Sequence, residues 1–150
     1  MNKMNNNKEI NKLIETEWFN QFDEYQKEQI RLGLEKELFV FVYAKDYFYG
    51  LQMEQIRLGL KHNIDVLIYA NKKYSWQQIK VIRKGLEKNF DINILLKEEF
   101  SFEQLLIIED GFEKNINILN VINNKLTREQ IKAILNCYLL GLKVEIKDFI

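Results

Sequence analysis

Proline is absent from this chain of 150 residues, and it holds only one cysteine, Cys137, and one histidine, His62. A single cysteine excludes an internal disulfide and any zinc site built from several cysteines. One histidine leaves little for metal binding or for acid–base catalysis near neutral pH. The formal net charge is zero, so the whole chain exerts no general attraction on nucleic acid, although a local basic stripe is compatible with this balance.

Sequence motifs that carry catalysis are missing as well. The chain has no Gly-rich phosphate-binding loop, no nucleophile elbow and no H-E-x-x-H motif. We therefore expect a protein without enzymatic activity, with no catalytic residues, no cofactor and no metal site. No apolar run approaches the roughly 20 residues that span a bilayer, and the Asn- and Lys-rich start lacks the apolar segment of a signal peptide. These features favour a cytoplasmic protein that does not enter membranes.

What the chain does contain is a repeat with a period of 26 residues. This shift aligns five glutamines and five isoleucines: Gln26, Gln52, Gln78, Gln104 and Gln130, with Ile30, Ile56, Ile82, Ile108 and Ile134. The repeats therefore begin near residues 22, 48, 74, 100 and 126. Such a period is typical of solenoids, in which each unit buries its apolar face only against its neighbours. The length and the 47% hydrophobic content are sufficient for a single helical-repeat domain over residues 1–150.

Each repeat opens with the signals of a helix N-terminus. Three residues before each glutamine is a cap position, occupied in turn by Asp23, Tyr49, Ser75, Ser101 and Thr127. The spacing S/T/D-x-x-Q is that of a capping box. A long helix of about 13 residues is expected to follow. It should end where a residue that tolerates the left-handed conformation stands, at Asn63, Asn89, Asn115 or Gly141. Glu37 breaks this column in the first copy.

Two features inside the repeat bear on its packing. Glycines at 33, 59, 85 and 111 fall inside the long helix, where each costs roughly 1 kcal/mol relative to alanine. We expect these glycines to let a neighbouring helix approach closely. After the long helix, Asp65, Asp91 or Asn117 is interpreted as the N-cap of a short second helix, although a short strand is the alternative because "NIDVLIYA" is rich in β-branched and aromatic residues.

The caps on both elements favour the helical interpretation. The predicted fold is therefore all-α: a right-handed, α-solenoid-like stack of helical hairpins, each made of a long and a short helix. Residues 7–19 carry apolar side chains at helical spacing and are expected to form an N-terminal capping helix.

The motif "QIRLGLKHNIDVLIYA", followed by an aromatic residue and a new Gln, resembles a set of short helical repeats in uncharacterised proteins of anaerobic gut bacteria and their mobile elements. The resemblance covers residues 22 to about 148, and it carries no catalytic residue over to this chain. It implies a binding surface. By analogy, small cytosolic proteins of this origin include phage inhibitors of bacterial defence systems, such as anti-CRISPR proteins.

A basic ladder is the first candidate binding site. Arg31, Arg57 and Arg83 occupy one column of the repeat, where guanidinium groups suit phosphates or an acidic protein ridge. The alternative is that these arginines pair with glutamates three or four residues away in their own helices.

Aromatic residues in "LFVFVYAKDYFYG" are the second candidate. Phe39, Phe41, Tyr47 and Tyr49 stand where the chain departs from the repeat consensus, and aromatic residues recur at protein interfaces. The alternative is that these rings pack under the N-terminal helix.

We expect a module that recognises another protein. The competing function is binding of RNA or a nucleotide, with the arginines on phosphates and Trp76 stacking on bases.

The last repeat exchanges polar columns for Leu135, Leu139 and Leu140, whereas a terminal unit should present a polar outer face. Either the C-terminal tail folds over these leucines, or two molecules meet there as a symmetric homodimer. We favour the dimer.

Overall fold

The computed structural model describes the backbone of residues 3–149 and the side chains of residues 6–148. Over this range the secondary structure consists of eight α-helices and four 3₁₀ helices without any strand, which confirms the all-α class. Backbone contacts divide the chain into two compact units, unit 1 (residues 1–76) and unit 2 (residues 77–150). The assignment of residues 1–150 to one domain stays a prediction. No helix within residues 3–149 is long and apolar enough to cross a bilayer.

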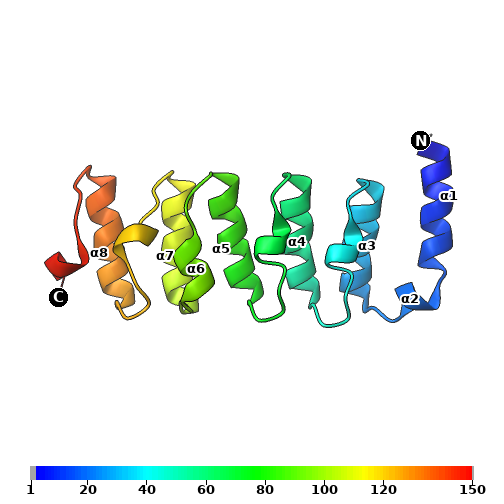
Figure 1. The fold of residues 1–150 in the computed structure, drawn as a ribbon, viewed down its shortest axis with the longest axis horizontal. Helices are drawn as coiled ribbons and strands as arrows, with labels where there is room; N and C mark the ends of the chain where they lie inside the picture. The colour runs from blue at the N-terminus through cyan, green and yellow to red at the C-terminus, as the bar shows by residue number, and fades with distance from the viewer. Residues whose placement is uncertain (1–2, 150) are drawn as a thin grey trace. The chain divides into compact units, whose positions relative to one another are not determined.

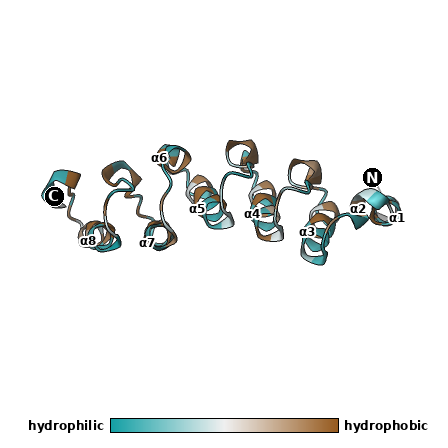
Figure 2. Cartoon of the chain, turned by 90° about the horizontal axis from the view of Figure 1, so that it is seen from below, coloured by the Kyte–Doolittle hydropathy of each residue, from teal (hydrophilic) through white to brown (hydrophobic). Residues whose placement is uncertain are grey.

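Unit 1 has two long helices of the repeat, packed beside each other. Its elements are α1 (Lys3–Ile14), α2 (Glu17–Asn20), α3 (Glu24–Glu35), η1 (Val40–Val42), α4 (Gly50–Lys61) and η2 (Val66–Ile68). Within the unit, α3 and α4 lie side by side (Figure 1), and the 3₁₀ helices η1 and η2 form a separate, largely hydrophobic layer (Figure 2).

Unit 2 repeats this plan. The helix α5 (Trp76–Glu87) begins at the last residue of unit 1 and continues into unit 2. The remaining elements are α6 (Asn93–Lys97), α7 (Phe102–Glu113), η3 (Leu119–Val121), α8 (Arg128–Leu139) and η4 (Ile146–Phe149). Here α7 and α8 pack side by side, and α6 and η3 lie on one side of them (Figure 2).

Predicted capping boxes form at Asp23, Ser101 and Thr127. The side chains of Ser101 and Thr127 accept hydrogen bonds from the backbone N–H groups of Gln104 and Gln130 at 3.2 and 3.1 Å. In return, each glutamine side-chain oxygen accepts from the N–H of its cap residue at 2.8 Å. Helices α3, α4, α5, α7 and α8 each have 12 residues, close to the predicted length. Local capping therefore fixes where the long helices begin.

The same glutamines also connect successive repeats, which the sequence did not predict. The side-chain Nε2 of Gln26 donates to the carbonyl oxygen of Phe48 at 2.6 Å, and that of Gln52 donates to Tyr74 at 2.8 Å. In unit 2, Gln104 donates to Leu126 at 2.8 Å. Each of these side chains thus joins its own helix to the backbone just before the next long helix.

The helix ends follow the predicted left-handed pattern, with one addition. The residue after the helix has a positive φ, between 57° and 77°, in all five copies: Glu37, Asn63, Asn89, Asn115 and Gly141. The next N–H donates back to the carbonyl of the column occupied by Gly33, Gly59, Gly85, Gly111 and Cys137, at 2.8 to 2.9 Å. This is the Schellman arrangement. Glu37 therefore adopts the left-handed conformation although it is neither Asn nor Gly.

The short second element is helical, as favoured. The side chains of Asp65, Asp91 and Asn117 accept from the N–H two residues later, at 3.0 to 3.2 Å. In the first, second and fourth copies the element is one turn of 3₁₀ helix, and in the third it is the five-residue α6. In the fifth copy the 3₁₀ helix η4 follows the long helix. The strand alternative does not occur in residues 3–149.

The helical glycines accommodate different groups in the two units. A Cβ on Gly33 would lie 2.0 Å from the hydroxyl oxygen of Tyr43, which follows η1 in the same repeat. Gly59 has the same relationship to Tyr69, at 1.9 Å. At these two positions the helix that approaches closely is the short 3₁₀ helix of the same repeat, since Val40 of η1 and Val66 of η2 would lie 2.6 and 2.8 Å from the added Cβ atoms. At Gly85 the nearest atom is Cγ2 of Ile92 in the same repeat, at 2.4 Å, and Phe112 of the next long helix follows at 3.0 Å.

The predicted helix over residues 7–19 is also wrong in one respect, because it is broken into α1 and α2. The hydroxyl of Thr16 donates to the carbonyl of Leu13 at 2.6 Å and accepts from the N–H of Phe19 at 3.3 Å. Thr16 therefore closes one helix and acts as the N-cap of the next. Helix α1 then packs beside α3 in unit 1.

Candidate functional site

The segment from residue 37 to residue 49, where the first repeat leads into the second, departs from the other copies at three structurally demanding positions. The first is Glu37, whose φ is 57°. The equivalent positions hold Asn63, Asn89, Asn115 and Gly141. A left-handed conformation costs roughly 1–2 kcal/mol for most residues, and Asn and Gly tolerate it best. Glu37 thus occupies a left-handed position that Asn or Gly, which tolerate this conformation better, occupies in every other copy.

The second position is Phe39. It replaces the Asp or Asn whose side chain accepts from the N–H two residues later in the next three copies. Where Asp65 accepts from the N–H of Leu67 at 3.2 Å, Phe39 supplies no side-chain hydrogen bond to η1 among the described atoms. Its ring is 67% exposed. The substitution therefore removes a cap and places a large apolar ring in water.

The third position is Tyr49, the N-cap residue of α4. The other four copies have Asp, Ser or Thr here. The Tyr49 N–H still donates to Gln52 Oε1 at 2.8 Å, but its own side chain forms no cap hydrogen bond in the described structure and is 79% exposed. Losing a Ser or Thr N-cap typically costs about 1 kcal/mol. At this position too, an exposed aromatic residue stands where the other copies have a helix-capping residue type.

Another aromatic residue, Tyr25, is held against the start of α4, and sequence reasoning missed it. A Cβ on Gly50 would lie 2.1 Å from Tyr25 Cδ1, so only glycine leaves room for the ring in this position. The Tyr25 hydroxyl donates to Glu54 Oε2 at 3.0 Å. Burial and this hydrogen bond raise the pKa of Tyr25. The available signal was Gly50 itself, because larger residues fill its column in the other copies.

These residues contribute to two exposed apolar surfaces of unit 1. We call the first the aromatic edge; it lies at the starts of α3 and α4 and comprises Tyr25, Tyr47, Tyr49 and Leu51, which are 41% to 79% exposed. The second is the 3₁₀ face, formed around η1 and η2 by Phe39, Phe41, Leu67 and Ile68, which are 41% to 76% exposed.

Phe41 has a partly structural role. Its ring centroid lies 5.6 Å from that of Trp18 in α2 and 5.9 Å from that of Phe39. Trp18 in turn contacts the buried Phe22 edge-on at 5.5 Å. The alternative interpretation, in which these rings pack against the N-terminal segment, therefore describes Phe41. It does not describe Tyr47 or Tyr49, which are half exposed or more.

The arginine column is engaged inside the protein. The Arg31 guanidinium lies 5.2 Å from the centre of the Phe19 ring, and Arg57 Nε donates to Gln29 Oε1 at 2.9 Å. Arg83 pairs with Glu87 on its own helix and is only 7% exposed. The intrahelical alternative is thus observed for Arg83, whereas Arg31 and Arg57 contact residues of other helices in unit 1.

In the fourth copy the same column holds Glu109, which also bonds to the preceding long helix. Its Oε1 pairs with Lys84 at 2.6 Å and with Lys80 at 2.9 Å, and Lys84 also pairs with Glu113 at 2.8 Å. Burial alone would raise the pKa of Glu109, but the hydrogen bonds and charges of the two lysines lower it overall. Burial alone would lower the pKa of Lys84, whereas its two carboxylates raise it. Two residues of this column therefore link neighbouring long helices. Arg57 joins α4 to α3, and Glu109 joins α7 to α5.

The remaining sequence candidates are not members of these two surfaces. Trp76 is half-buried at the first position of α5. Leu135 is fully buried in unit 2, so it is not part of an exposed interface. Leu139 and Leu140 are exposed, at 43% and 78%. Leu142, which the sequence prediction omitted, is exposed beside them in the chain.

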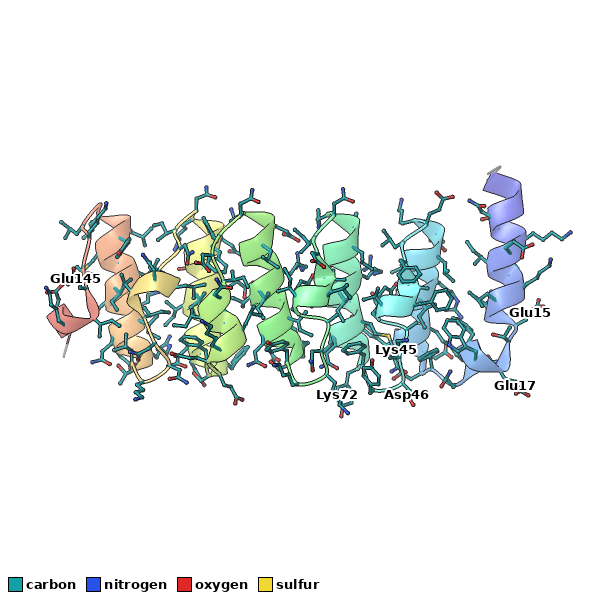
Figure 3. The ribbon with its side chains drawn as sticks, in the orientation of Figure 1. Glu15, Glu17, Lys45, Asp46, Lys72 and Glu145 are labelled. Carbon is teal, nitrogen blue, oxygen red and sulfur yellow. The ribbon has the colours of Figure 1, made fainter. Side chains whose placement is uncertain are left out.

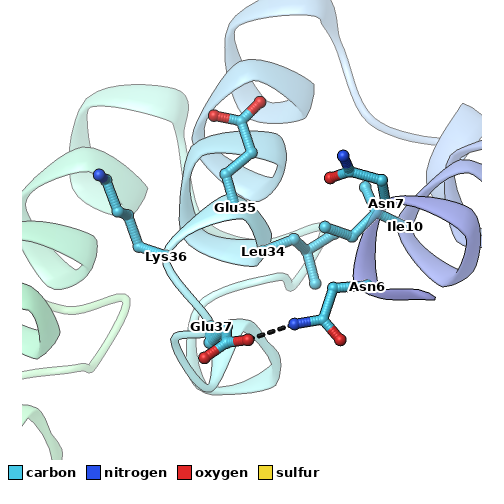
Figure 4. Close-up of a pocket in the computed structure, with 7 residues that line it drawn as sticks. All are labelled: Asn6, Asn7, Ile10, Leu34, Glu35, Lys36 and Glu37. Atoms are coloured by element: carbon cyan, nitrogen blue, oxygen red, sulfur yellow. Dashed lines mark hydrogen bonds between the residues drawn. The ribbon is translucent and has the colours of Figure 1, made fainter. Parts of the chain in front are cut away.

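Sites for chemistry are sparse. The side chains of residues 6–148 include no group of three or more His, Cys, Asp or Glu residues arranged to hold a metal ion. A hollow of about 600 Å³ lies in unit 1 between α1 and the end of α3, and its lining includes Ile10, Leu34 and Lys36. Figure 4 shows Asn6 donating to Glu37 across it. Its lining offers no pair of a nucleophile and a base.

Comparisons with known proteins assign no family to this chain. No family model matches the chain, and neither a curated protein nor a solved structure matches it.

Proposed function

We propose that this chain is a non-enzymatic helical-repeat protein that binds another protein through the exposed aromatic side chains of unit 1. The observation that carries the proposal is the set of departures at Glu37, Phe39 and Tyr49. Glu37 stands where the other four copies have Asn or Gly, and Tyr49 where the other four have Asp, Ser or Thr. Phe39 stands where the next three copies have Asp or Asn. Phe39 and Tyr49 break local rules and expose their rings to water, as is characteristic of functional sites, whereas the Glu37 side chain accepts a hydrogen bond from Asn6 of α1.

The chemistry of the exposed residues suits protein recognition. Tyr and Phe offer large contact areas and lose little conformational entropy when they are buried, since each has only two side-chain torsions. The Tyr25 ring is held in place by Gly50 and Glu54, so part of the aromatic edge is ordered before any partner binds. Such preorganisation reduces the entropic cost of association.

The finer architecture belongs to the same proposal. We propose that the five repeats follow one another as an α-solenoid-like stack of helical hairpins. The glutamine bonds from one repeat to the next, which recur in both units, support this arrangement. Repeat stacks present extended surfaces built from equivalent positions of successive units.

The kind of partner is suggested by the resemblance of the repeat motif to proteins of gut bacteria and their mobile elements. On that basis we propose a cytoplasmic protein of a bacterial defence system as the partner, inhibited by this chain. The competing proposal, binding of RNA through the arginine column, gains no support from the geometry, because Arg31, Arg57 and Arg83 already have partners within the protein.

The proposal is tested by capture from bacterial lysate with the immobilised full chain, with and without nuclease. The test variant is Phe39→Asp/Tyr49→Ser, which installs residues from other copies. The control is Phe102→Arg, which removes an exposed ring from unit 2 and installs the residue of the fifth copy. We expect a protein retained by wild type and control but lost by the test variant. Equal capture by all three, or capture abolished by nuclease, contradicts the proposal.

A further inference from the structure

A row of four aromatic rings leads from the core of unit 1 to the exposed ring of Phe39. The buried Phe22 contacts Trp18 of α2 edge-on, with 5.5 Å between the ring centroids. Trp18 contacts Phe41 of η1 at 5.6 Å, and Phe41 contacts Phe39 at 5.9 Å. Each separation lies within the roughly 4.5–7 Å over which aromatic pairs attract one another. The exposed ring is therefore connected to the core through α2.

The helix η1 keeps the backbone geometry of η2 although its side-chain cap is missing. The N–H of Tyr43 donates to the carbonyl oxygen of Val40 at 3.0 Å, and the equivalent hydrogen bond in η2 has the same length. Asp65 caps η2 with its side chain, whereas Phe39 supplies no such hydrogen bond to η1 within the described residues. Contacts from another part of the chain therefore take the place of the cap.

A second contact holds the chain on the other side of Phe39. The side-chain Nδ2 of Asn6 in α1 donates to Oε1 of Glu37, two residues before Phe39 (Figure 4). The hollow of about 600 Å³ lies beside this bond, so little packing replaces the contact when the bond is lost. Phe39 is thus bracketed by two anchored residues, Glu37 before it and Phe41 after it.

Both contacts come from α1 and α2, which together we call the N-terminal segment. Thr16 ends the first of these helices and caps the second, and Glu15 and Glu17 mark the corner between them in Figure 3. Helix α1 packs beside α3, whereas α2 brings Trp18 to η1. The break in the helix therefore lets one short segment contact the chain on both sides of Phe39.

We propose that the N-terminal segment positions Phe39 for partner binding. The positioning residues are Asn6, which acts through Glu37, and Trp18, which acts through Phe41. This inference rests on the proposed function and deepens it, because it assigns the control of one binding ring to a separate part of unit 1. A ring that is held in place before the partner arrives loses less entropy on binding.

NMR relaxation of the ¹⁵N-labelled full chain tests the positioning directly. Asn6→Ala removes the donor to Glu37, and Trp18→Ala interrupts the row of rings. In the double variant we expect the amide order parameters of residues 38–42 to fall from about 0.85, the value of rigid backbone, toward about 0.6. The amides of residues 64–68 around η2 should keep their wild-type values. Unchanged order in residues 38–42 overturns the inference.

A matched control keeps the chemistry of each contact. Asn7 also lines the hollow but forms no side-chain hydrogen bond within residues 6–148, so Asn7→Ala/Trp18→Phe alters the same helices while it retains the donor and a ring. This control should keep wild-type order in residues 38–42. If the test variant loses the signals of folded α3, the single change Asn6→Ala provides the same comparison against Asn7→Ala, with a smaller loss of order.

Lysate capture separates positioning from a merely structural effect. We expect the test variant to retain several-fold less of the protein whose capture depends on Phe39 and Tyr49. The matched control should retain as much as wild type, and so should Phe90→Ala, which removes one ring of an aromatic pair in unit 2. If order in residues 38–42 falls but capture does not, the inference is overturned and the proposed function stands. If Phe39→Asp/Tyr49→Ser captures as much as wild type, the proposed function fails and the inference fails with it.

Discussion

Gln26 bonds to two repeats at once: its Oε1 accepts from the N–H of Asp23 at 2.8 Å, and its Nε2 donates to the carbonyl oxygen of Phe48 at 2.6 Å. Both groups of this side chain are largely buried, since Gln26 is 8% exposed. A capping residue therefore also holds the next repeat in register. This double role suits glutamine better than glutamate at Gln26, Gln52 and Gln104, because a carboxylate has no donor for the second bond.

The first prediction concerns this side chain. Gln26→Ala should lower the free energy of unfolding by about 1–3 kcal/mol, because it leaves two backbone groups without their partner. Gln26→Glu is the matched variant: it keeps the capping oxygen and loses the donor to Phe48. Urea unfolding should find Gln26→Glu clearly destabilised. Wild-type stability for Gln26→Glu would show that only the capping bond matters.

A second prediction follows from the left-handed residue at the end of α3. Glu37→Asn should stabilise the protein by about 1 kcal/mol, because Asn tolerates a φ of 57° better than Glu does. The reverse change at the equivalent site, Asn63→Glu, should destabilise it by a similar amount. Chemical denaturation of both variants measures this. Changes of the same sign in the two variants would refute the conformational explanation.

Gly33 supplies a third prediction. A helical Gly→Ala change normally stabilises by about 1 kcal/mol, but here the new Cβ would meet the Tyr43 hydroxyl at 2.0 Å. Tyr43 is fully buried and donates to the carbonyl of Gln29 at 2.7 Å, so its ring cannot move aside freely. Gly33→Ala should therefore destabilise by about 1–3 kcal/mol.

The double variant Gly33→Ala/Tyr43→Phe checks the cause of this loss. Removing the hydroxyl relieves the closest contact, so the alanine should cost less in the Tyr43→Phe background than in wild type. Additive effects of the two changes in thermal unfolding would show that the hydroxyl is not what excludes a side chain at Gly33.

The fourth prediction is a pH dependence set by Glu109 in unit 2. Its pKa is lowered in the folded protein, so its contribution to stability is present above the ordinary value of 4.5 and is lost as pH falls through the folded pKa. Lys84 has a raised pKa, so its contribution is present at neutral pH and is lost in the alkaline range above 10.5. Glu109→Gln should therefore be less stable than wild type at pH 7.

The size of that difference should depend on pH. Stability curves of wild type and Glu109→Gln, measured by urea unfolding, should converge only as the pH falls through the lowered pKa of Glu109, below its ordinary value of 4.5. A stability gap that is constant from pH 7 to pH 3 would mean that the pairs with Lys80 and Lys84 do not contribute.

Much of the fold was predictable because its signals are local. Cap residues three positions before a glutamine, and Asn or Gly after the helix, act within a few residues, so Ser101 and Asn115 could be placed from the sequence. The break at Thr16 escaped because its residue type suits a cap but also occurs inside helices. The bond from Gln26 to Phe48 escaped because it spans 22 residues and depends on packing.

Some residues of the candidate site could likewise be predicted from the sequence, and others required the structure. Phe39 and Tyr49 stood out because they break a column that the chain itself defines, and the structure places both in water. The role of Tyr25 required coordinates, because it rests on the space above Gly50. The arginine column was misleading, since regular spacing does not reveal whether a side chain such as Arg83 points to solvent or pairs internally.

The central claim is that the exposed aromatic residues Phe39 and Tyr49 are retained for binding at the expense of stability. The most direct measurement is the free energy of unfolding of Phe39→Asp/Tyr49→Ser, made alongside its capture of partner from lysate. We predict that the free energy of unfolding of this variant exceeds that of wild type by about 1 kcal/mol or more, and that it no longer captures the partner. A variant that is less stable than wild type, or that still captures the partner, would contradict the claim.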